Sequence, residues 1–155
     1  MMYFNRLIEL REQVGFTQLK MAKQLGIDNS VYAKYEKEYE IMPIKYLNIL
    51  CDFFNVSFDY LFEFTNTCND KKENKNIEIK IVGERLKAFR KSQKLTQVKL
   101  ASILNTVQPV IANYEKGKNL IATPFLYTIC KKYNISADYL LGKIDEPINI
   151  SNKKL

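Results

Sequence analysis

The side chains that could take part in chemistry are of few kinds in this sequence. Its 155 residues include no His and three Cys, and no CxxC pair or Cys/His cluster has the spacing of a metal site. There is also no phosphate-cradling glycine loop, and no nucleophile and base at a recognisable spacing. We therefore expect no enzyme activity, no metal and no cofactor. What remains is binding chemistry, through the charge and hydrogen bonds of lysine, arginine and amide side chains.

The cysteines and the start of the chain indicate a compartment. Cys51 and Cys130 lie in apolar runs and are expected to be reduced core residues, whereas Cys68 stands alone in a polar stretch. An unpaired thiol fits the cytosol. The first residues reach Arg6 without an apolar run long enough for a signal peptide or a membrane span. We expect a cytoplasmic protein without a membrane partner.

The sequence repeats itself at a distance of 79 residues. Residues 6–61 align with residues 85–140 without a gap, and 20 of these 56 pairs are identical. Two repeats are too few for a solenoid, so duplication of a small domain is the better interpretation. The identical pairs include Arg11 with Arg90, Thr17-Gln18 with Thr96-Gln97, and Tyr35-Glu36-Lys37 with Tyr114-Glu115-Lys116.

Composition sets the expected boundaries. We predict a first domain at residues 1–65, a linker at 66–80, a second domain at 81–142 and a flexible tail at 143–155. Residues 66–76 are polar and charged without a hydrophobic period, as in flexible linkers. The tail contains Pro147 and few apolar anchors. Residues 77–81 alternate isoleucine with charge, which fits either an extended lead-in or the start of a helix.

The apolar period inside each domain is helical, and we find no convincing strand. Thr17 and Thr96 are expected to cap the second helix of each domain, Asp28 the third helix of the first domain, and Ser57 and Ser136 a short fifth helix. Proline marks the first turn of the fourth helix, and Gly117 the end of the third helix of the second domain. The fold class is therefore all-α, with two tandem domains of about five helices each. The expected buried stripes are Leu7, Leu10 and Val14, then Leu19, Ala22 and Leu25, matched by Val98, Ala101 and Leu104.

Both domains resemble the Cro/phage-repressor family of helix-turn-helix domains, of the xenobiotic-response-element type. The resemblance covers roughly 120 residues and implies a lambda-repressor-like five-helix fold, with the third helix in the major groove of double-stranded DNA. In the first domain it rests on Arg11, residues 16–18, Ala22, residues 25–26, 35–37, 55–57 and 59–61. In the second it rests on Arg90, residues 95–97, Ala101, Leu104, residues 114–117, 134–136 and 138–142.

The resemblance also implies which residues touch DNA. An amide can bond bidentately to adenine, so the amides of the third helix would read bases. Pro109 offers no hydrogen bond to a base, so in the second domain the reading would rest on Gln108, Asn113 and apolar contact of Val110 with thymine methyls. Gln18 and Gln97 match a phosphate contact, but they also fit solvated residues of a first turn. The matching base-reading positions are Asn29, Ser30, Ala33 and Lys34 in the first domain and Gln108, Pro109, Val110, Ala112 and Asn113 in the second.

Two arginines look basic enough to touch DNA. In the family that the chain resembles, however, this position holds an internal ion pair with the Glu of the Tyr-Glu motif. We therefore expect the structural pairs Arg11–Glu36 and Arg90–Glu115.

Charge separates the two domains. Residues 1–63 hold 7 basic and 9 acidic residues, whereas residues 81–142 hold 10 basic and 3 acidic residues, in a chain of net charge +7. The second domain thus has the positive field that DNA attracts, and we expect it to be the main DNA reader. Candidate phosphate contacts are Lys87, Lys91, Lys94, Lys99, Lys116 and Lys118.

The first domain departs from the family pattern in charge and aromatic content. Glu38 replaces the glycine that ends the third helix, and residues 1–64 hold 13 of the 19 Phe and Tyr residues. A surplus of aromatics favours a protein–protein surface, with drift in composition as the alternative. We expect a homodimer or a protein partner through this domain. The aromatics in question are Tyr39, Phe58, Phe62 and Phe64, and the expected dimer surface is the fifth helix, around Phe58, Leu61 and Phe62 or around Leu140 and Leu141.

The resemblance implies a sequence-specific transcriptional regulator that binds an operator in double-stranded DNA. A repressor is expected by family analogy. Either each domain reads one half-site, or the second domain reads DNA while the first binds another protein. The alternative from another class is a protein-binding regulator, antitoxin-like or inhibitor-type, built on a helix-turn-helix scaffold.

Overall fold

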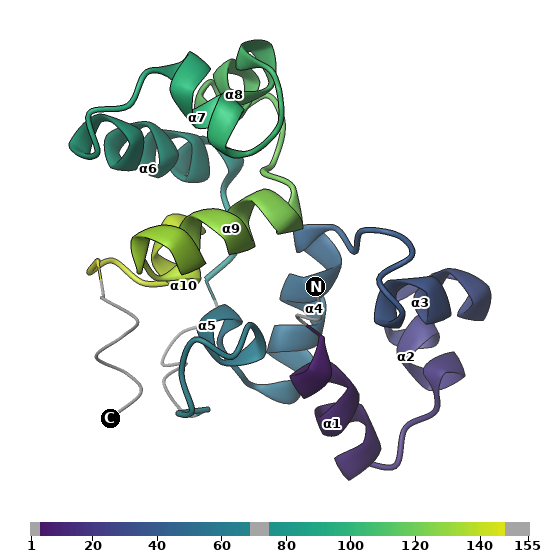
Figure 1. The fold of residues 1–155 in the computed structure, drawn as a ribbon. Helices are drawn as coiled ribbons and strands as arrows, with labels where there is room; N and C mark the ends of the chain where they lie inside the picture. Colours follow the sequence, from purple (N-terminus) through teal and green to yellow (C-terminus); the bar gives the residue numbers. More distant parts are fainter. Residues whose placement is uncertain (1–3, 69–74, 148–155) are drawn as a thin grey trace. The chain divides into compact units, whose positions relative to one another are not determined.

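The computed structural model describes residues 4–68 and 75–147, which fall into two compact units. They correspond to the first and second domains, and each is described by itself. All regular elements of the described residues are helices, five in each unit (Figure 1). The predicted all-α fold with two tandem five-helix domains is confirmed.

The first domain runs α1 (Asn5–Gln13), α2 (Gln18–Leu25), α3 (Asn29–Glu36), α4 (Ile44–Phe54) and α5 (Phe58–Leu61). Helix α2 packs against α3 and α4, and α4 packs against the short α5. Figure 1 shows α2 and α3 as close neighbours joined by a tight turn. These contacts leave the outer side of α3 open to solvent.

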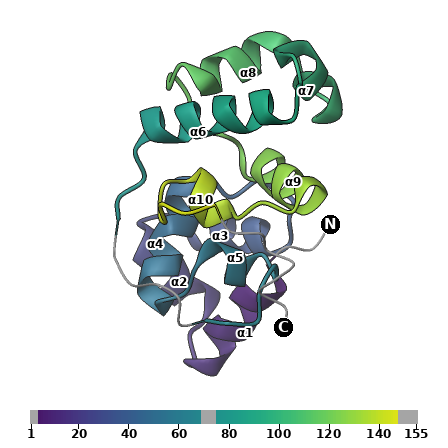
Figure 2. The same cartoon turned by 90° about the vertical axis from the view of Figure 1, so that its left-hand side faces the viewer.

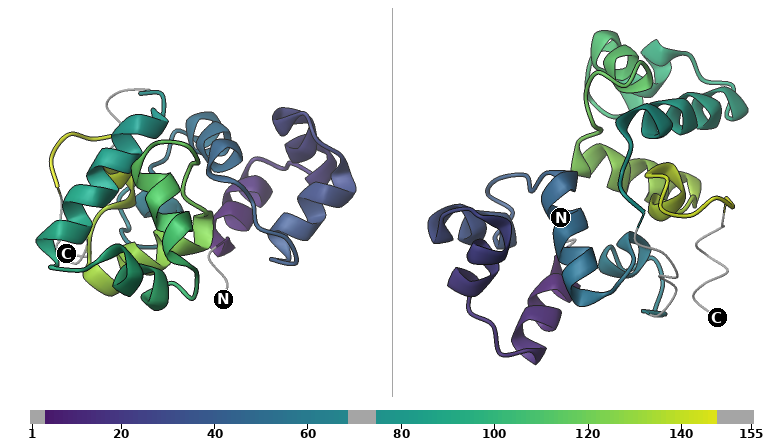
Figure 3. Two further views of the ribbon diagram at one scale, coloured as in Figure 1. Left: turned by 90° about the horizontal axis from the view of Figure 1, so that it is seen from above. Right: turned by 180° about the vertical axis from the view of Figure 1, so that it is seen from behind.

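The second domain repeats this order with α6 (Ile79–Ser92), α7 (Gln97–Ile103), α8 (Gln108–Glu115), α9 (Thr123–Tyr133) and α10 (Ala137–Leu140). Helix α8 packs against α6 and α7, and α10 packs against α6 and α9. Figure 2 shows α8 lying along α6, and Figure 3 shows the same helices from above and from behind.

Side-chain caps start four of the helices at the predicted residues. The Thr17 and Thr96 hydroxyls accept from the backbone N–H groups of Lys20 and Lys99 at 3.2 and 3.1 Å. The Ser57 and Ser136 hydroxyls do the same for α5 and α10. Asp28 occupies the N-cap position of α3, but its side chain makes no capping hydrogen bond. The prediction of a side-chain cap by Asp28 is therefore wrong.

The apolar stripes are only partly those predicted. Ala22 and Leu25 are buried in α2, but Leu19 is 49% exposed, and Val98 in α7 is 64% exposed. Both lie at the second position of their helix, on the face that is open to solvent. Met21 and Leu100 take the buried positions instead, beside Ala22 and Ala101. In α1 only Leu7 of the predicted stripe is buried, and Val14 is half exposed.

The surplus aromatics of the first domain mostly belong to the core. Phe58, Phe62 and Phe64 are buried, whereas Tyr39 is exposed. The ring centroids of Phe58 and Phe62 lie 6.1 Å apart, and those of Phe62 and Phe64 lie 5.8 Å apart. Leu61, Leu140 and Leu141 are buried as well. The expected dimer surface at the fifth helix is thus wrong, because the side chains that would form it are part of each domain's own core.

The edges of the second domain lie outside the predicted limits of residues 81–142. Helix α6 begins at Ile79, so residues 77–81 are a lead-in followed by a helix start. Lys143 is buried, and its Nζ donates to the Lys75 carbonyl at 2.7 Å, while Asp145 pairs with Lys75 at 2.8 Å. The contacts of this domain therefore extend to Asp145. The remaining residues of the predicted linker and tail, 69–74 and 148–155, lie outside the described part.

Helix α6 begins earlier than its counterpart α1 in the first domain, and its additional first turn requires a glycine. Gly83 faces the end of α8, where an added Cβ would lie 2.5 Å from the Tyr114 carbonyl oxygen and 2.7 Å from that of Glu115. No side chain fits at these distances, so Gly83 allows α6 to approach the C-terminus of α8. Sequence reasoning missed this residue, because the matching position in the first domain is Phe4, before the start of α1.

Candidate functional site

The candidate site in each domain is the outer side of a two-helix element, α2 with α3 and α7 with α8. Ala22 and Ala101 are buried where the two helices meet, and their small size allows close approach. The turn after α2 includes Gly26 in the left-handed conformation, with φ of 65°. This arrangement directs the first turn of α3 and of α8 away from the core.

A buried ion pair fixes the third helix to the first helix in both domains. In the second domain Arg90 Nε donates to Glu115 Oε1 at 2.9 Å, and its Nη1 donates to the Leu95 carbonyl at 2.8 Å. The two side chains are only 10% and 3% exposed. This arrangement holds α6, the turn before α7 and the end of α8 together through one guanidinium.

The first domain repeats the pair. Arg11 Nε donates to Glu36 Oε1 at 2.6 Å, and Nη1 donates to the Phe16 carbonyl at 2.9 Å. The hydrogen bond and the negative charge of Glu36 raise the pKa of Arg11 above its ordinary value, although burial opposes this rise. Both arginines are thus engaged inside the protein.

The glutamines predicted to touch phosphate are tied to these ion pairs. Gln18 Nε2 donates to Glu36 Oε2 at 2.9 Å, and Gln97 Nε2 donates to Glu115 Oε2 at 2.6 Å. The carboxylates therefore fix the orientation of each amide group. Neither glutamine is a freely solvated first-turn residue in this structure.

Among the described residues, the network reaches the start of the third helix only in the second domain. Gln108 Nε2 donates to Gln97 Oε1 at 2.7 Å, so a chain of hydrogen bonds runs from Arg90 through Glu115 and Gln97 to Gln108. One amide hydrogen and the carbonyl oxygen of Gln108 are not used by this bond. Those two groups have the donor–acceptor geometry that the major-groove edge of adenine needs.

The other predicted site residues of the second domain surround Gln108 along the chain. Pro109 is exposed directly after it, and Val110 and Asn113 are half-buried in α8. Gly117, with φ of 72°, ends the helix after Lys116. The lysines of the predicted set are exposed: Lys87, Lys91, Lys94, Lys99, Lys116 and Lys118.

The same face of the first domain has a different character. Asn29 and Ser30 are exposed at the start of α3, and Lys34 Nζ forms an ion pair with Glu40 Oε1 at 3.1 Å. Lys34 matches Asn113, so an acidic residue engages the side chain at a predicted reading position. Glu38 takes the left-handed conformation of Gly117, with φ of 58°.

A buried tyrosine further separates the two domains. Tyr32 is fully buried where the second domain has Ile111, and its hydroxyl has no hydrogen bond of normal geometry. Burial raises the pKa of Tyr32 far above its usual range, and the nearby Glu36 carboxylate adds to this rise. The ion pair of the first domain thus borders a polar group that the second domain lacks.

Arg6 and Arg85 hold the fifth helix of each domain in place. They are an identical pair in the repeat, which singles them out in the sequence, but only the structure shows their role. Arg85 Nη1 donates to the carbonyl oxygens of Tyr139 and Ile144, and its guanidinium carbon lies 4.5 Å from the centre of the Tyr139 ring. Arg6 makes the matching contacts with Tyr60 and Thr65. Each arginine attaches the short fifth helix to the first helix.

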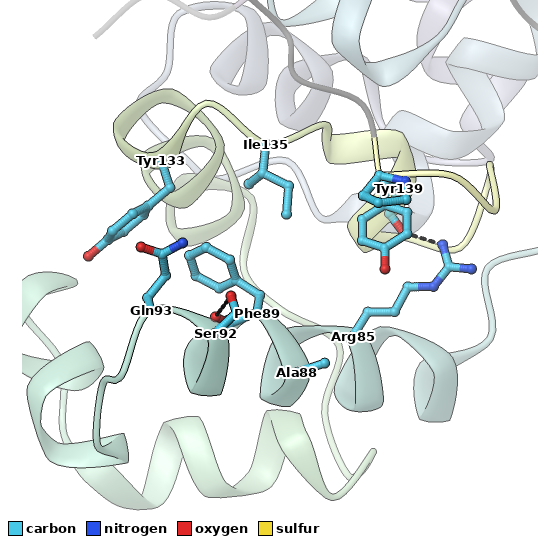
Figure 4. Close-up of a pocket in the computed structure, with 9 residues that line it drawn as sticks. Arg85, Ala88, Phe89, Ser92, Gln93, Tyr133, Ile135 and Tyr139 are labelled. Atoms are coloured by element: carbon cyan, nitrogen blue, oxygen red, sulfur yellow. Dashed lines mark hydrogen bonds between the residues drawn. The ribbon is translucent and has the colours of Figure 1, made fainter.

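A cavity of about 310 Å³ lies in the second domain between α6, α9 and α10 (Figure 4). Phe89 and Tyr133 line it with rings in an edge-on arrangement, 5.1 Å between centroids. Arg85 borders the cavity, but its guanidinium is engaged with carbonyl oxygens of the chain. We therefore assign the arginine to holding α10 on α6.

The described residues hold neither a candidate metal site nor a helix that could cross a membrane. No three His, Cys, Asp or Glu side chains gather there in a way that could hold a metal ion. None of the described helices is both long and apolar enough to span a bilayer.

Two family profiles match the chain, each over one domain. A profile described as "Helix-turn-helix" matches residues 7–61, and one described as "Helix-turn-helix domain" matches residues 83–146. The matches contain the α2–α3 and α7–α8 pairs described above. The predicted tandem pair of Cro/phage-repressor-type domains is thereby confirmed.

Three curated bacterial proteins are similar to part of the chain. The "Uncharacterized HTH-type transcriptional regulator YobD" of Bacillus subtilis is 36% identical over 77 residues, which are 50% of this chain and 69% of that protein. "Antitoxin PezA" of Streptococcus pneumoniae is 30% identical over 69 residues, 44% of this chain and 43% of that protein. "HTH-type transcriptional regulator ImmR" of Bacillus subtilis is 39% identical over 56 residues, which are 36% of this chain and 44% of that protein. The chain thus spans about two thirds of the first relative and less than half of the other two.

Proposed function

The chain belongs to the helix-turn-helix family of transcriptional regulators, and we propose that it binds double-stranded DNA in a sequence-specific manner, with the second domain as the main reader. It acts on an operator as a repressor, in the cytoplasm, and the proposed activity involves no catalysis. The observation that supports this most directly is the Arg90–Glu115–Gln97–Gln108 network at the start of α7 and α8.

This network supplies preorganised hydrogen-bonding groups. Gln97 and Gln108 fix one another, so fewer side-chain rotamers are lost when DNA binds. The N-terminus of α7 adds backbone N–H groups that favour phosphate, which sets the register of the domain on the duplex. Gln108 then reads adenine through its remaining amide hydrogen and its carbonyl oxygen, while Val110 and Pro109 offer apolar contact to thymine methyls.

The charges around the network supply affinity. Lys99 lies in the first turn of α7, and Lys116 and Lys118 follow α8 directly, all three exposed. Phosphate neutralisation by such lysines gives binding that weakens steeply with salt. Arg90 is excluded from this role because Glu115 and the Leu95 carbonyl already use its hydrogen atoms.

Selection of the purified chain on random duplex DNA at about 150 mM salt tests the proposal. We expect an enriched motif with a defined half-site. Gln108→Ala should then cost about 1–3 kcal/mol of binding free energy and relax the preference at one position of the half-site. Asn29→Ala, at the matching position of the first domain, is the control and should leave the motif unchanged. Weak binding without an enriched motif would contradict the proposal.

Repression is the finer part of the proposal and needs its own assay. In transcription in vitro from a promoter that overlaps the selected motif, added protein should lower transcript yield, and Gln108→Ala should restore it. A rise in transcript yield would show an activator instead.

A second candidate function, protein binding through the first domain, is favoured by its surface. Lys34 is paired with Glu40, and Tyr39 and Ile41 are exposed beside it. One relative, PezA, is named an antitoxin. If Lys34→Glu left DNA affinity unchanged, the idea that both domains read half-sites would be refuted and the division between a reading domain and a binding domain would stand.

A further inference from the structure

The cavity between α6, α9 and α10 of the second domain has the composition of a small-molecule site. Most of its lining residues are aromatic or apolar, and Arg85 is the one charged residue among them. Sites for organic ligands are commonly of this kind, with apolar walls and a few polar groups that fix the orientation of the ligand. Ala88, Gln93 and Pro147 of the lining are exposed, so the cavity opens to solvent.

Two small side chains on α6 leave this space unfilled. Ala88 and Ser92 are four residues apart on one side of the helix, and both line the cavity. The matching residues of the first domain are Glu9 and Gln13, whose side chains are longer. The duplicated fold therefore accepts larger residues at both positions, and the small ones are a feature of the second domain.

The walls of the cavity suit a flat aromatic ligand. Phe89 and Tyr139 stand on opposite sides of the space, and the Ile135 side chain points toward it (Figure 4). Aromatic rings pack well against the faces and edges of other rings. A cavity of about 150 Å³ can hold one benzene molecule, so about 310 Å³ gives room for two fused rings.

The polar groups of the lining favour a neutral ligand. The Arg85 guanidinium already donates to the carbonyl oxygens of Tyr139 and Ile144, so it does not offer a free positive charge to an anion. The Tyr139 hydroxyl points away from α10 toward α6, and it makes no hydrogen bond within the described part of the chain (Figure 4). This hydroxyl can donate one hydrogen bond to a ligand or accept one from it.

We propose that this cavity binds a neutral small molecule with two fused aromatic rings and one polar group. The rings lie between Phe89 and Tyr139, and the polar group bonds to the Tyr139 hydroxyl.

The place of the cavity on α6 makes the ligand an effector of DNA binding, a step that rests on the proposed function. Phe89 lines the cavity, and the next residue, Arg90, holds Glu115 of α8. Gln93 lines the cavity as well, two residues before Leu95, whose carbonyl accepts from Arg90. A ligand in contact with Phe89 and Gln93 therefore acts on the segment that positions the reading network.

Titration of the full chain with 2-naphthol, followed by the fluorescence of the naphthol, tests the site without DNA. The chain has no Trp, so the naphthol can be excited with little emission from the protein. We expect saturable binding with a dissociation constant of about 10 µM to about 1 mM, as suits a ligand of this size. Naphthalene-2-sulfonate, which has the same rings but a negative charge, should bind about tenfold more weakly or less well still.

Variants of the lining locate the binding. Ala88→Glu with Ser92→Gln introduces the residues of the matching positions in the first domain and should raise the dissociation constant by about tenfold or more. Tyr139→Phe keeps the ring but removes the hydroxyl, and should raise the constant by about threefold to tenfold. Glu84→Ala changes an exposed residue of α6 outside the cavity and is the control that should leave the constant unchanged.

Three results would overturn the ligand site: no saturable binding of 2-naphthol up to about 1 mM, binding that neither lining variant weakens, or tighter binding of the sulfonate, which would indicate the basic surface instead. If circular dichroism shows that the double variant has lost helix, Tyr139→Phe decides the matter.

The effector role is tested with the duplex selected for the chain. Saturating 2-naphthol should change the affinity for this duplex by about threefold or more, and DNA should change the affinity for 2-naphthol by the same factor. Equal DNA affinities with and without 2-naphthol would refute the effector role. A chain that binds 2-naphthol in the cavity but no DNA would refute the proposed function and support the ligand site.

Discussion

Replacement of Glu115 by Gln tests how much the buried ion pair, which positions the proposed reading face, contributes to stability. Gln is nearly the same size but has no charge, so the variant leaves the Arg90 guanidinium buried without its counter-charge. The side chains are 10% and 3% exposed, and Glu115 accepts from both Arg90 and Gln97. Loss of one partner of such a pair costs about 3–5 kcal/mol, and we expect the lower value because Gln still offers one carbonyl oxygen.

The loss should appear in the second domain alone. With a urea slope of about 1–3 kcal/mol per molar for a small domain, about 3 kcal/mol lowers the midpoint by roughly 1–3 M. Circular dichroism follows total helix content, and hydrogen exchange resolved by peptide assigns the loss to residues 75–147 or 4–68. Glu36→Gln is the matched control, because it removes the charge from the same pair in the first domain and should lower the stability of residues 4–68 instead.

DNA binding separates a structural role from a contact role. If Glu115 only supports the fold, the fraction of Glu115→Gln that remains folded at low temperature should still bind DNA, weakened by the disturbed Gln97 and Gln108. A stability change below about 1 kcal/mol in the second domain would refute the reasoning, because it would mean that the pair is not effectively desolvated.

Three further changes have expected outcomes. Tyr32→Phe removes a buried hydroxyl without a hydrogen bond and should stabilise the first domain by about 1 kcal/mol in urea unfolding. The pKa of Tyr32 is raised in the folded state, so the stability linked to its protonated hydroxyl is complete below about pH 10 and is lost as pH rises above it. The variant should therefore also flatten the fall in stability at alkaline pH. Gly83→Ala should destabilise the second domain by about 1–3 kcal/mol, since its Cβ would lie 2.5 Å from a carbonyl oxygen, and unchanged thermal unfolding would contradict this packing. Glu38→Gly should stabilise the first domain by about 1 kcal/mol, because the residue has φ of 58°, and a lower unfolding midpoint would exclude strain at this position.

Local sequence rules were sufficient for most of the helices and their starts. Threonine and serine caps act on backbone groups two or three residues away, so Thr17, Thr96, Ser57 and Ser136 could be identified from the sequence alone. Asp28 shows the limit of these rules, because it has the residue type and place of a cap but forms no capping bond.

Burial was harder to predict, because it depends on which face of an element meets its neighbours. Leu19 and Val98 have the right spacing for a stripe, yet α4 and α8 pack against the face that holds Met21 and Leu100. Phe62 and Phe64 looked like surplus aromatics, but they are buried. A count of aromatics cannot tell a core from a surface.

The sequence by itself determined the duplication, the family of both domains and the charge difference between them, since identity at a fixed offset of 79 residues and the distribution of charged residues need no coordinates. Only the tertiary structure decided how the polar residues are connected. Arg90 and Glu115 are 25 residues apart, and Gln97 and Gln108 are 11 apart, so folding of α6, α7 and α8 must bring them within hydrogen-bond distance. The contact between the turn after α1 and α4 likewise exists only in the folded chain, since it brings together the rings of Phe16 and Phe53, which are 37 residues apart.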